Sequence, residues 1–324
     1  MKQLALAAAM LAMTLAGAKA APDETMRTFW PRTDFSKIDV PFGEIISGGV
    51  PRDAIPALTD PQMIPLGEAE IPDREPVMTL ELDGEAARAY PLRYLTWHEI
   101  VNDVVGGRPV AVTFCPLCNS GLIFDRRVGG QTLNFGVSGL LRHSDMIMFD
   151  RETHSWWQQF TGAAIVGEMV GNELDLIVSW MEPMSAFAER NPDGLVMAEP
   201  QANRPYGRNP YTGYDSSLRA FLYRGEDPPH GIPPLSRVVR VGGRAWPLER
   251  LQDGPVEEAG VILDWQAGMA SALDQSSIAE SRDIGFVRVR EAATGADVAH
   301  EVIFAFAFHA FEPEGTWMLG DAAP

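Results

Sequence analysis

The pattern of apolar and polar positions along the chain predicts more strands than helices. Residues 76–92 read "PVMTLELDGEAARAYPL" and alternate around a central Asp-Gly pair, which is typical of a β-hairpin. The apolar run "PVAVTF" at 109–114 is typical of a buried strand. Between them, residues 94–105 ("YLTWHEIVNDVV") have apolar residues at helical spacing. We therefore expect a helix there, with Thr96 as its N-cap and an end at Gly106-Gly107.

Shorter apolar runs separated by turn residues follow. Three of them predict strands: "GLIFDRRV" (121–128), "QTLNFGVSG" (131–139) and "DMIMFDRET" (145–153). Gly129-Gly130 predicts a hairpin turn between the first two runs. A further strand is expected within 155–167, and a helix within 181–192 that ends at Pro192.

Two stretches of the second half resemble stretches of the first. "GGRAWPLERL" (242–251) matches "AARAYPLRYL" (86–95), and residues 261–274 align with residues 112–125 without a gap. A degenerate internal repeat explains both echoes in their shared order. The expected fold is therefore α+β and strand-rich, built from two related units that pack together.

The start of the chain has the pattern of a secretory signal peptide. Lys2 precedes an apolar run over Leu4–Ala16, and Ala18-Lys19-Ala20 resembles a cleavage site, so we expect cleavage after Ala20 and a periplasmic or secreted protein. No later run has the length and apolarity of a membrane span. The expected organisation is a signal peptide (1–20), an irregular N-terminal arm (21–74), a first repeat unit with the cysteines (75–200), a turn-rich linker or lid (201–234) and a degenerate second unit (235–324).

The chain is acidic, with a formal net charge of −18 over 324 residues. Acidic surfaces repel phosphate backbones and anionic lipid headgroups, which argues against nucleic acid and membrane surfaces as partners. A hydrophobic content of 46% with 22% charged residues is ordinary for a globular protein. The partner is therefore expected to be an unknown exported protein or a small molecule.

Cys115 and Cys118, the only two cysteines, stand in "VTFCPLCNSGLIFD" at the end of a predicted strand. A C-x-x-C pair can be a redox dithiol, half of a metal site or a small structural disulfide. The residues that follow do not continue as a helix, which argues against a thioredoxin-like fold. Asp264 and Ala267 replace the cysteines in the aligned segment of the second unit, so we infer that the pair does more than hold the unit together.

Three motifs, "GEAARAYPLRYLTWHEIVNDVVGG", "VTFCPLCNSGLIFDR" and "VSGLLRHSDMIMFDRETHSWWQQ", together resemble the domain of unknown function 3179 family. The resemblance runs from about Gly43 to Met197, and the second half of the chain looks like a degenerate copy of the same unit. It implies an exported protein of a family without an established reaction. Asn119 and Gly121 depart from the family pattern, in which a small residue and alanine are expected. His143 stands at a position that the family does not fix.

A metal site would need ligands beyond two thiolates, because no second C-x-x-C or H-x-x-x-H pattern is present. Thiolate and thioether ligands favour soft metals, so copper or zinc at Cys115 and Cys118 is the expected cofactor if the protein has one. The candidate metal or redox residues are Cys115, Cys118, His143, Met146 and His154. An alternative explanation makes Met146 core filler, because it alternates with Ile147 along a predicted strand.

A second hypothesis is an enzyme or small-ligand-binding protein that uses the polar and aromatic residues after the cysteines. Its candidate ligand-binding residues are Ser120, Ser138, Ser144, Asp145, Asp150, Arg151, Ser155, Trp156 and Gln158. Asp150 with Thr153 is also typical of a turn cap. Neither G-x-S-x-G nor H-E-x-x-H is present, so no catalytic residue is assigned. A third hypothesis is a structural interaction module with an inert disulfide. We favour a cysteine-dependent role, and metal binding over redox chemistry.

Overall fold

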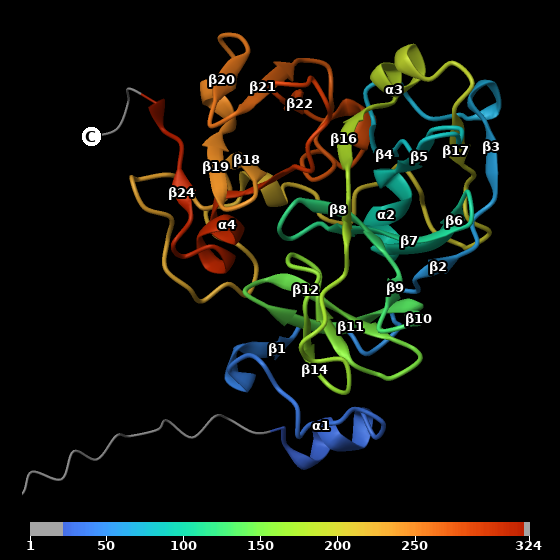
Figure 1. Cartoon of the computed structure of the whole chain (residues 1–324), viewed down its shortest axis with the longest axis vertical. Helices are drawn as coiled ribbons and strands as arrows, with labels where there is room; N and C mark the ends of the chain where they lie inside the picture. The colour runs from blue at the N-terminus through green and yellow to red at the C-terminus, as the bar shows by residue number, and fades with distance from the viewer. Residues whose placement is uncertain (1–21, 321–324) are drawn as a thin grey trace, which may run out of the picture.

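The computed structural model describes residues 22–320, whose strands form five main β-sheets arranged like the blades of a propeller (Figure 1). Strands hold 36% of the residues and helices 15%. The predicted signal peptide (1–20) lies outside the described residues. None of the helices within 22–320 has the length and apolarity needed to cross a membrane.

Three sheets come from residues 45–197. Sheet I has the strand order β16-β4-β5-β17-β3, sheet II the order β15-β8-β7-β6-β2, and sheet III the order β1-β11-β12-β13-β14. The strands of sheet I are β3 (Met63–Pro65), β4 (Pro76–Leu80), β5 (Arg88–Pro91), β16 (Ser179–Pro183) and β17 (Leu195–Met197). Those of sheet II are β2 (Leu58–Thr59), β6 (Ile100–Val105), β7 (Arg108–Cys115), β8 (Ser120–Asp125) and β15 (Leu176–Ile177). Those of sheet III are β1 (Ile45–Ser47), β11 (Phe135–Arg142), β12 (Asp145–Asp150), β13 (Trp156–Gln158) and β14 (Ala164–Val166).

Two sheets come from residues 237–317. Sheet IV has the order β23-β18-β19-β24 and sheet V the order β20-β21-β22. Their strands are β18 (Arg237–Val241), β19 (Arg244–Pro247), β20 (Val256–Glu258), β21 (Val261–Gln266), β22 (Phe286–Glu291), β23 (Glu301–Phe304) and β24 (Thr316–Trp317). A separate ribbon pairs β9 (Arg127–Val128) with β10 (Gln131–Thr132) across the predicted Gly-Gly turn.

The helices are short, and α2, α3 and α4 each begin directly after a strand. The α-helices are α1 (Glu24–Phe29), α2 (Leu92–His98), α3 (Met184–Arg190) and α4 (Ala305–Phe311). The 3₁₀ helices are η1 (Phe42–Glu44), η2 (Leu66–Glu68), η3 (Tyr214–Ser216), η4 (Leu248–Leu251) and η5 (Ile278–Glu280). The N-terminal segment before β4 supplies β1, β2 and β3, each of which is the edge strand of a different sheet.

The predicted α+β fold of two related units packed together is wrong, because five sheets rather than two units make up the described chain. The sequence echo has a local cause. The "RAYPL" segment forms β5 and starts α2, and "RAWPL" forms β19 and starts η4. These two strands take the same place in the orders β16-β4-β5-β17 and β23-β18-β19-β24. The similar sequences therefore form equivalent strands, β5 and β19, in two of the five sheets.

The gapless alignment over the cysteines also fails in three dimensions. Strand β7 ends at Cys115, and β8 begins at Ser120 after a short turn. In the aligned segment β21 continues to Gln266, and residues 269–274, which align with β8, belong to no strand. Asp264 lies within β21, opposite Arg288 of β22. The connection from β21 to its antiparallel neighbour β22 spans residues 267–285, far longer than the cysteine turn. The aligned positions are therefore not structurally equivalent, and the replacement of the cysteines says nothing about their role.

Several strand predictions are confirmed and one helix prediction is wrong. The hairpin of β4 and β5 and the buried strand β7 lie where the apolar pattern placed them. The helix expected over 94–105 is divided: α2 ends at His98, and Ile100–Val105 is strand β6, paired with β7 and β2. Thr96 lies inside α2 and caps nothing; its hydroxyl donates to the Arg93 carbonyl at 3.3 Å.

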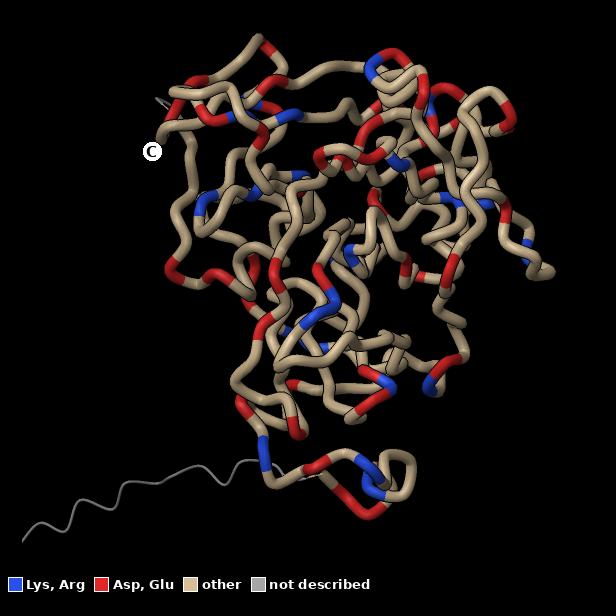
Figure 2. The backbone as a smooth tube through the Cα atoms, turned by 45° about the vertical axis from the view of Figure 1, so that its right-hand side comes forward, with Lys and Arg blue, Asp and Glu red and all other residues tan. Residues whose placement is uncertain are grey.

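The largest hydrophobic core joins residues of sheets I to IV and helix α4, among them Met78, Phe114, Trp157 and Phe306. A second, aromatic core packs the N-terminal arm onto sheet III, where the rings of Trp30 and Trp156 meet edge to face at 5.1 Å. Acidic and basic positions are spread over the whole fold in Figure 2.

Candidate metal centre

The two cysteines lie on a tight turn between adjacent strands of sheet II. Cys115 is the last residue of β7 and pairs with Ser120, the first residue of β8. The Cys118 amide donates to the Cys115 carbonyl at 3.3 Å, and Asn119 has a φ of 54°, a left-handed conformation that asparagine tolerates. The Asn119 side chain donates to the Val302 carbonyl at 2.7 Å, which ties the turn to β23.

A second tight turn, on sheet III, places a carboxylate beside the thiols. Strands β11 and β12 are joined by His143-Ser144, both with positive φ (52° and 65°), as a two-residue hairpin turn requires. Asp145 follows as the first residue of β12. The donor atoms of Cys115, Cys118 and Asp145 all lie within 4.8 Å of one another, and all three residues are buried.

Asp145 has one satisfied oxygen and one free oxygen. Its Oδ1 accepts from the Gln158 side-chain amide at 2.6 Å and from the Phe160 backbone amide at 3.0 Å. Its Oδ2 is buried without a hydrogen-bond partner among the described residues. Burial raises the pKa of the Asp145 carboxyl to about 7, and hydrogen bonds from Gln158, from the Phe160 amide and from the Cys115 thiol offset only part of that rise. The carboxylate is thus oriented by its neighbours and has one oxygen available for a ligand.

The thiols are free and held in place by the backbone. The Cys118 Sγ donates to the Ser144 carbonyl at 3.5 Å, so the two turns contact each other directly. Burial raises the pKa of Cys115, and it raises the pKa of Cys118 further, with a contribution from the neighbouring thiol. Both thiols are therefore protonated at neutral pH in the metal-free protein. A thiol in that state is a poor nucleophile.

The predicted histidine ligands lie elsewhere. His143 points toward Glu44, with Nε2 at 3.3 Å from its carboxylate, and packs on Phe311. His154 contacts the Arg32 guanidinium at 2.9 Å. The Met146 side chain lines a cavity beside the cysteine turn and is buried, so it also serves as the predicted core filler.

The polar segment after the cysteines does not converge on one site. Ser144 and Gln158 join Asp145 at the cysteine turn. Asp150 caps the turn that follows β12 through Thr153 and also accepts from the Trp157 indole at 2.9 Å, as the turn-cap interpretation predicts. The remaining candidates have separate partners: Ser120 donates to Glu301, Ser138 to the Ile147 carbonyl and Arg151 to Asp53, while Ser155 accepts from the Met169 amide and Trp156 belongs to the aromatic core.

A cavity of about 390 Å³ lies beside the cysteine turn and contains a carboxylate that the sequence did not reveal. This carboxylate is Glu99, the residue between α2 and β6, which has a φ of 58°. Leu117 and Met146 line the cavity on the side of the metal centre, and Tyr211 and Tyr214 line it from the 201–234 segment. The apolar pattern places Glu99 inside a predicted helix, where a glutamate gives no indication of a functional site.

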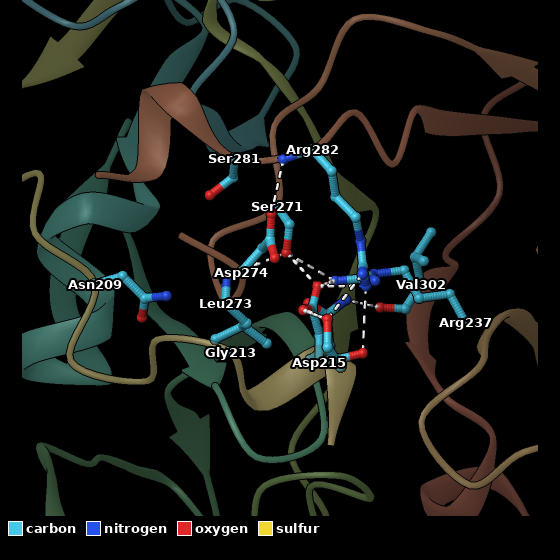
Figure 3. Close-up of polar contacts among 12 residues, drawn as sticks. Asn209, Gly213, Asp215, Arg237, Ser271, Leu273, Asp274, Ser281, Arg282 and Val302 are labelled. Atoms are coloured by element: carbon cyan, nitrogen blue, oxygen red, sulfur yellow. Dashed lines mark hydrogen bonds and ion pairs between the residues drawn. The ribbon is translucent and has the colours of Figure 1, made fainter. Parts of the chain in front are cut away.

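Two sets of contacts hold the part of the 201–234 segment that lines the cavity. The Tyr214 hydroxyl donates to the Leu117 carbonyl, between the cysteines, at 2.9 Å. The neighbouring Asp215 is buried and accepts from Arg237 at 2.9 Å and Ser271 at 2.6 Å, and Arg282 forms a second ion pair with it at 3.0 Å (Figure 3). This ion-pair cluster anchors η3, and with it the wall of the cavity.

Comparison with known proteins gives one match. A family model described as "Protein of unknown function (DUF3179)" matches residues 52–315, which confirms the resemblance and extends it through the second half of the chain. No curated protein matched the chain, and no solved structure did.

Proposed function

The chain belongs to this family of unknown function, and we propose that it binds a transition-metal ion through the Cys115 and Cys118 thiolates and the Asp145 carboxylate. The observation that carries the proposal is the buried cluster itself: donor atoms of Cys115, Cys118 and Asp145 all lie within 4.8 Å of one another, and the Asp145 Oδ2 has no hydrogen-bond partner among the described residues. A buried carboxylate oxygen without a partner is costly, and a cation bound between it and the thiols removes the cost.

Metal binding fits this chemistry better than thiol redox does. A redox dithiol needs a thiolate of lowered pKa near solvent, whereas both thiols are buried and their pKa values are raised. A metal ion favours the thiolate directly by displacing the proton, so binding releases protons even from thiols of high pKa. An inert disulfide is not supported either, because the cysteines are free.

The donor set favours zinc over copper. Two thiolates with one carboxylate oxygen form a mixed set that Zn²⁺ accepts, whereas Cu(I) prefers sulfur donors alone. Three protein ligands leave the fourth position of a tetrahedral ion open to water or a small molecule. The Gln158 amide would orient the Asp145 carboxylate from behind, as outer hydrogen-bond partners do at metal sites. We place this site in an exported protein because of the signal-peptide pattern over residues 1–20.

Metal analysis of the purified protein tests the proposal. We expect one zinc ion per chain in the wild type and none in Cys115→Ser, Cys118→Ser or Asp145→Asn. Asp125→Asn is the matched control, because Asp125 is also buried but pairs with Arg108 and Arg127 away from the thiols. Cobalt substitution gives a second readout, since cobalt–thiolate bonds absorb in the near ultraviolet. A wild-type protein that neither carries nor takes up zinc refutes the proposal, and copper through the same residues would refute the choice of metal.

A further inference from the structure

Among the described residues, Glu99 is the one buried carboxylate outside the proposed metal centre that has neither an arginine partner nor more than one hydrogen bond to its side chain. Six buried carboxylates pair with arginine: Glu75, Asp103, Asp125, Glu182, Asp215 and Glu301. Asp150 is satisfied by three hydrogen bonds. Glu99 has only the Tyr211 hydroxyl, at a long 3.4 Å, and is 7% exposed. A carboxylate buried in this way favours a cation from outside the chain.

The cavity at Glu99 has the surroundings that an organic cation needs. Its walls are mainly apolar, and three aromatic residues line it: Tyr211, Tyr214 and Phe221. Aromatic rings attract ammonium groups through their negative faces, and a desolvated carboxylate strengthens that preference. A volume of about 390 Å³ accepts a short apolar chain together with the charged group.

The carboxylate is held in position independently of any ligand. The Glu99 carbonyl accepts from the Phe114 amide at 2.8 Å, and its amide donates to the Leu95 carbonyl at 2.7 Å. These bonds hold the residue at a φ of 58°, a conformation that costs a non-glycine residue about 1 kcal/mol or more. Tyr214 is fixed by the Leu117 carbonyl. Both the charged and the aromatic parts of the cavity wall are therefore preorganised.

We propose that the cavity binds a small organic ammonium ion with a short apolar chain, whose nitrogen contacts the Glu99 carboxylate and the tyrosine rings. This site is separate from the proposed metal centre and needs no metal ion. Ser217, an exposed residue that lines the cavity, marks its opening to solvent.

Binding of n-butylammonium, measured by calorimetry and ligand-observed NMR on metal-free protein in phosphate buffer, tests the inference. We expect n-butylammonium to bind roughly tenfold more tightly than n-butanol, and butyrate not to bind. Glu99→Gln should abolish the preference for the ammonium ion while leaving n-butanol binding nearly unchanged. Glu257→Gln is the control for overall charge, because Glu257 is exposed on β20.

Equal binding of n-butanol and n-butylammonium to the wild type overturns the inference, and so does an unchanged preference in Glu99→Gln. If Glu99→Gln does not fold, Ser217→Trp decides: a bulky side chain at the opening must weaken n-butylammonium binding, and unchanged binding overturns the proposal. The same titration in Cys118→Ser separates the two proposals. Ammonium binding persists in that variant whether or not the wild type binds zinc.

Discussion

Replacing Glu99 with glutamine should change the pH dependence of stability in a defined direction. Burial raises the pKa of this carboxyl from its ordinary value of 4.5 to about 7, and the Tyr211 hydroxyl offsets only part of that. The folded protein thus binds this proton more tightly than the unfolded chain does. The contribution of Glu99 to the free energy of unfolding therefore falls as pH rises from about 4.5 to about 7, and this loss reaches about 3 kcal/mol at higher pH. Glutamine does not ionise, so the variant escapes this cost.

The assay is urea unfolding of metal-free wild type and Glu99→Gln from pH 4.5 to pH 8. Phosphate and acetate buffers are needed, because amine buffers would compete for the cavity. We expect the stability of the variant relative to the wild type to rise by about 3 kcal/mol across this range. The same comparison with Glu257→Gln, at an exposed position, should be flat. A flat or falling difference for Glu99→Gln would refute the claim that this carboxylate is buried without a cationic partner.

Three further changes test the metal centre and the fold. Gln158→Leu removes a donor to Asp145 and should weaken zinc binding roughly 10–100-fold in chelator competition; unchanged affinity would mean that the amide does not orient the ligand. Burial disfavours the Asp125 charge, but hydrogen bonds from two arginines outweigh it and lower the pKa to about 2. The stability advantage over Asp125→Asn should therefore shrink by about 1–2 kcal/mol as pH falls from 5 to 2 in urea unfolding, and a constant advantage would contradict this. Gly139→Ala should cost about 2 kcal/mol or more, because φ is 76° and a Cβ would lie 2.1 Å from a backbone oxygen. Gly130→Ala, at a φ of 78° in open space, should cost only about 1 kcal/mol, so equal costs in denaturant unfolding would refute the steric argument.

The strands were predictable where apolar residues ran continuously or alternated between turn residues, as in β4, β5 and β7. Strand β6 was not, because Ile100–Val105 is buried on both faces apart from Val104 and so lacks alternation. Its apolar residues happen to continue the helical spacing of α2, the helix that precedes it. The five-sheet arrangement was hidden for a different reason: β16 and β17 complete a sheet begun by β4 and β5, and nothing local encodes that long-range pairing.

The cysteines could be identified from sequence by their isolation and spacing, but their third partner could not. Imidazole and thioether groups bind soft metals, so His143, Met146 and His154 are the ligands that the sequence predicts. The residue that lies beside the thiols is instead Asp145, which directly follows the turn between β11 and β12. The sequence shows only which residue types could bind a metal. The hairpin between β11 and β12 determines which of their side chains lies beside the thiols. A tight turn on a second sheet thus determines the composition of the site.

That assignment can be tested at His143 itself. The residue has a φ of 52° in the turn before Asp145, and its side chain contacts Glu44 and Phe311 instead of the sulfur atoms. Asparagine tolerates this backbone conformation better, so His143→Asn should keep the turn and lose only the outer contacts. We expect zinc affinity within about threefold of the wild type and a change in unfolding free energy below about 1 kcal/mol. Loss of zinc binding in His143→Asn, with the fold intact by circular dichroism, would show that the histidine is a ligand and that the two cysteines and Asp145 are not the complete protein ligand set.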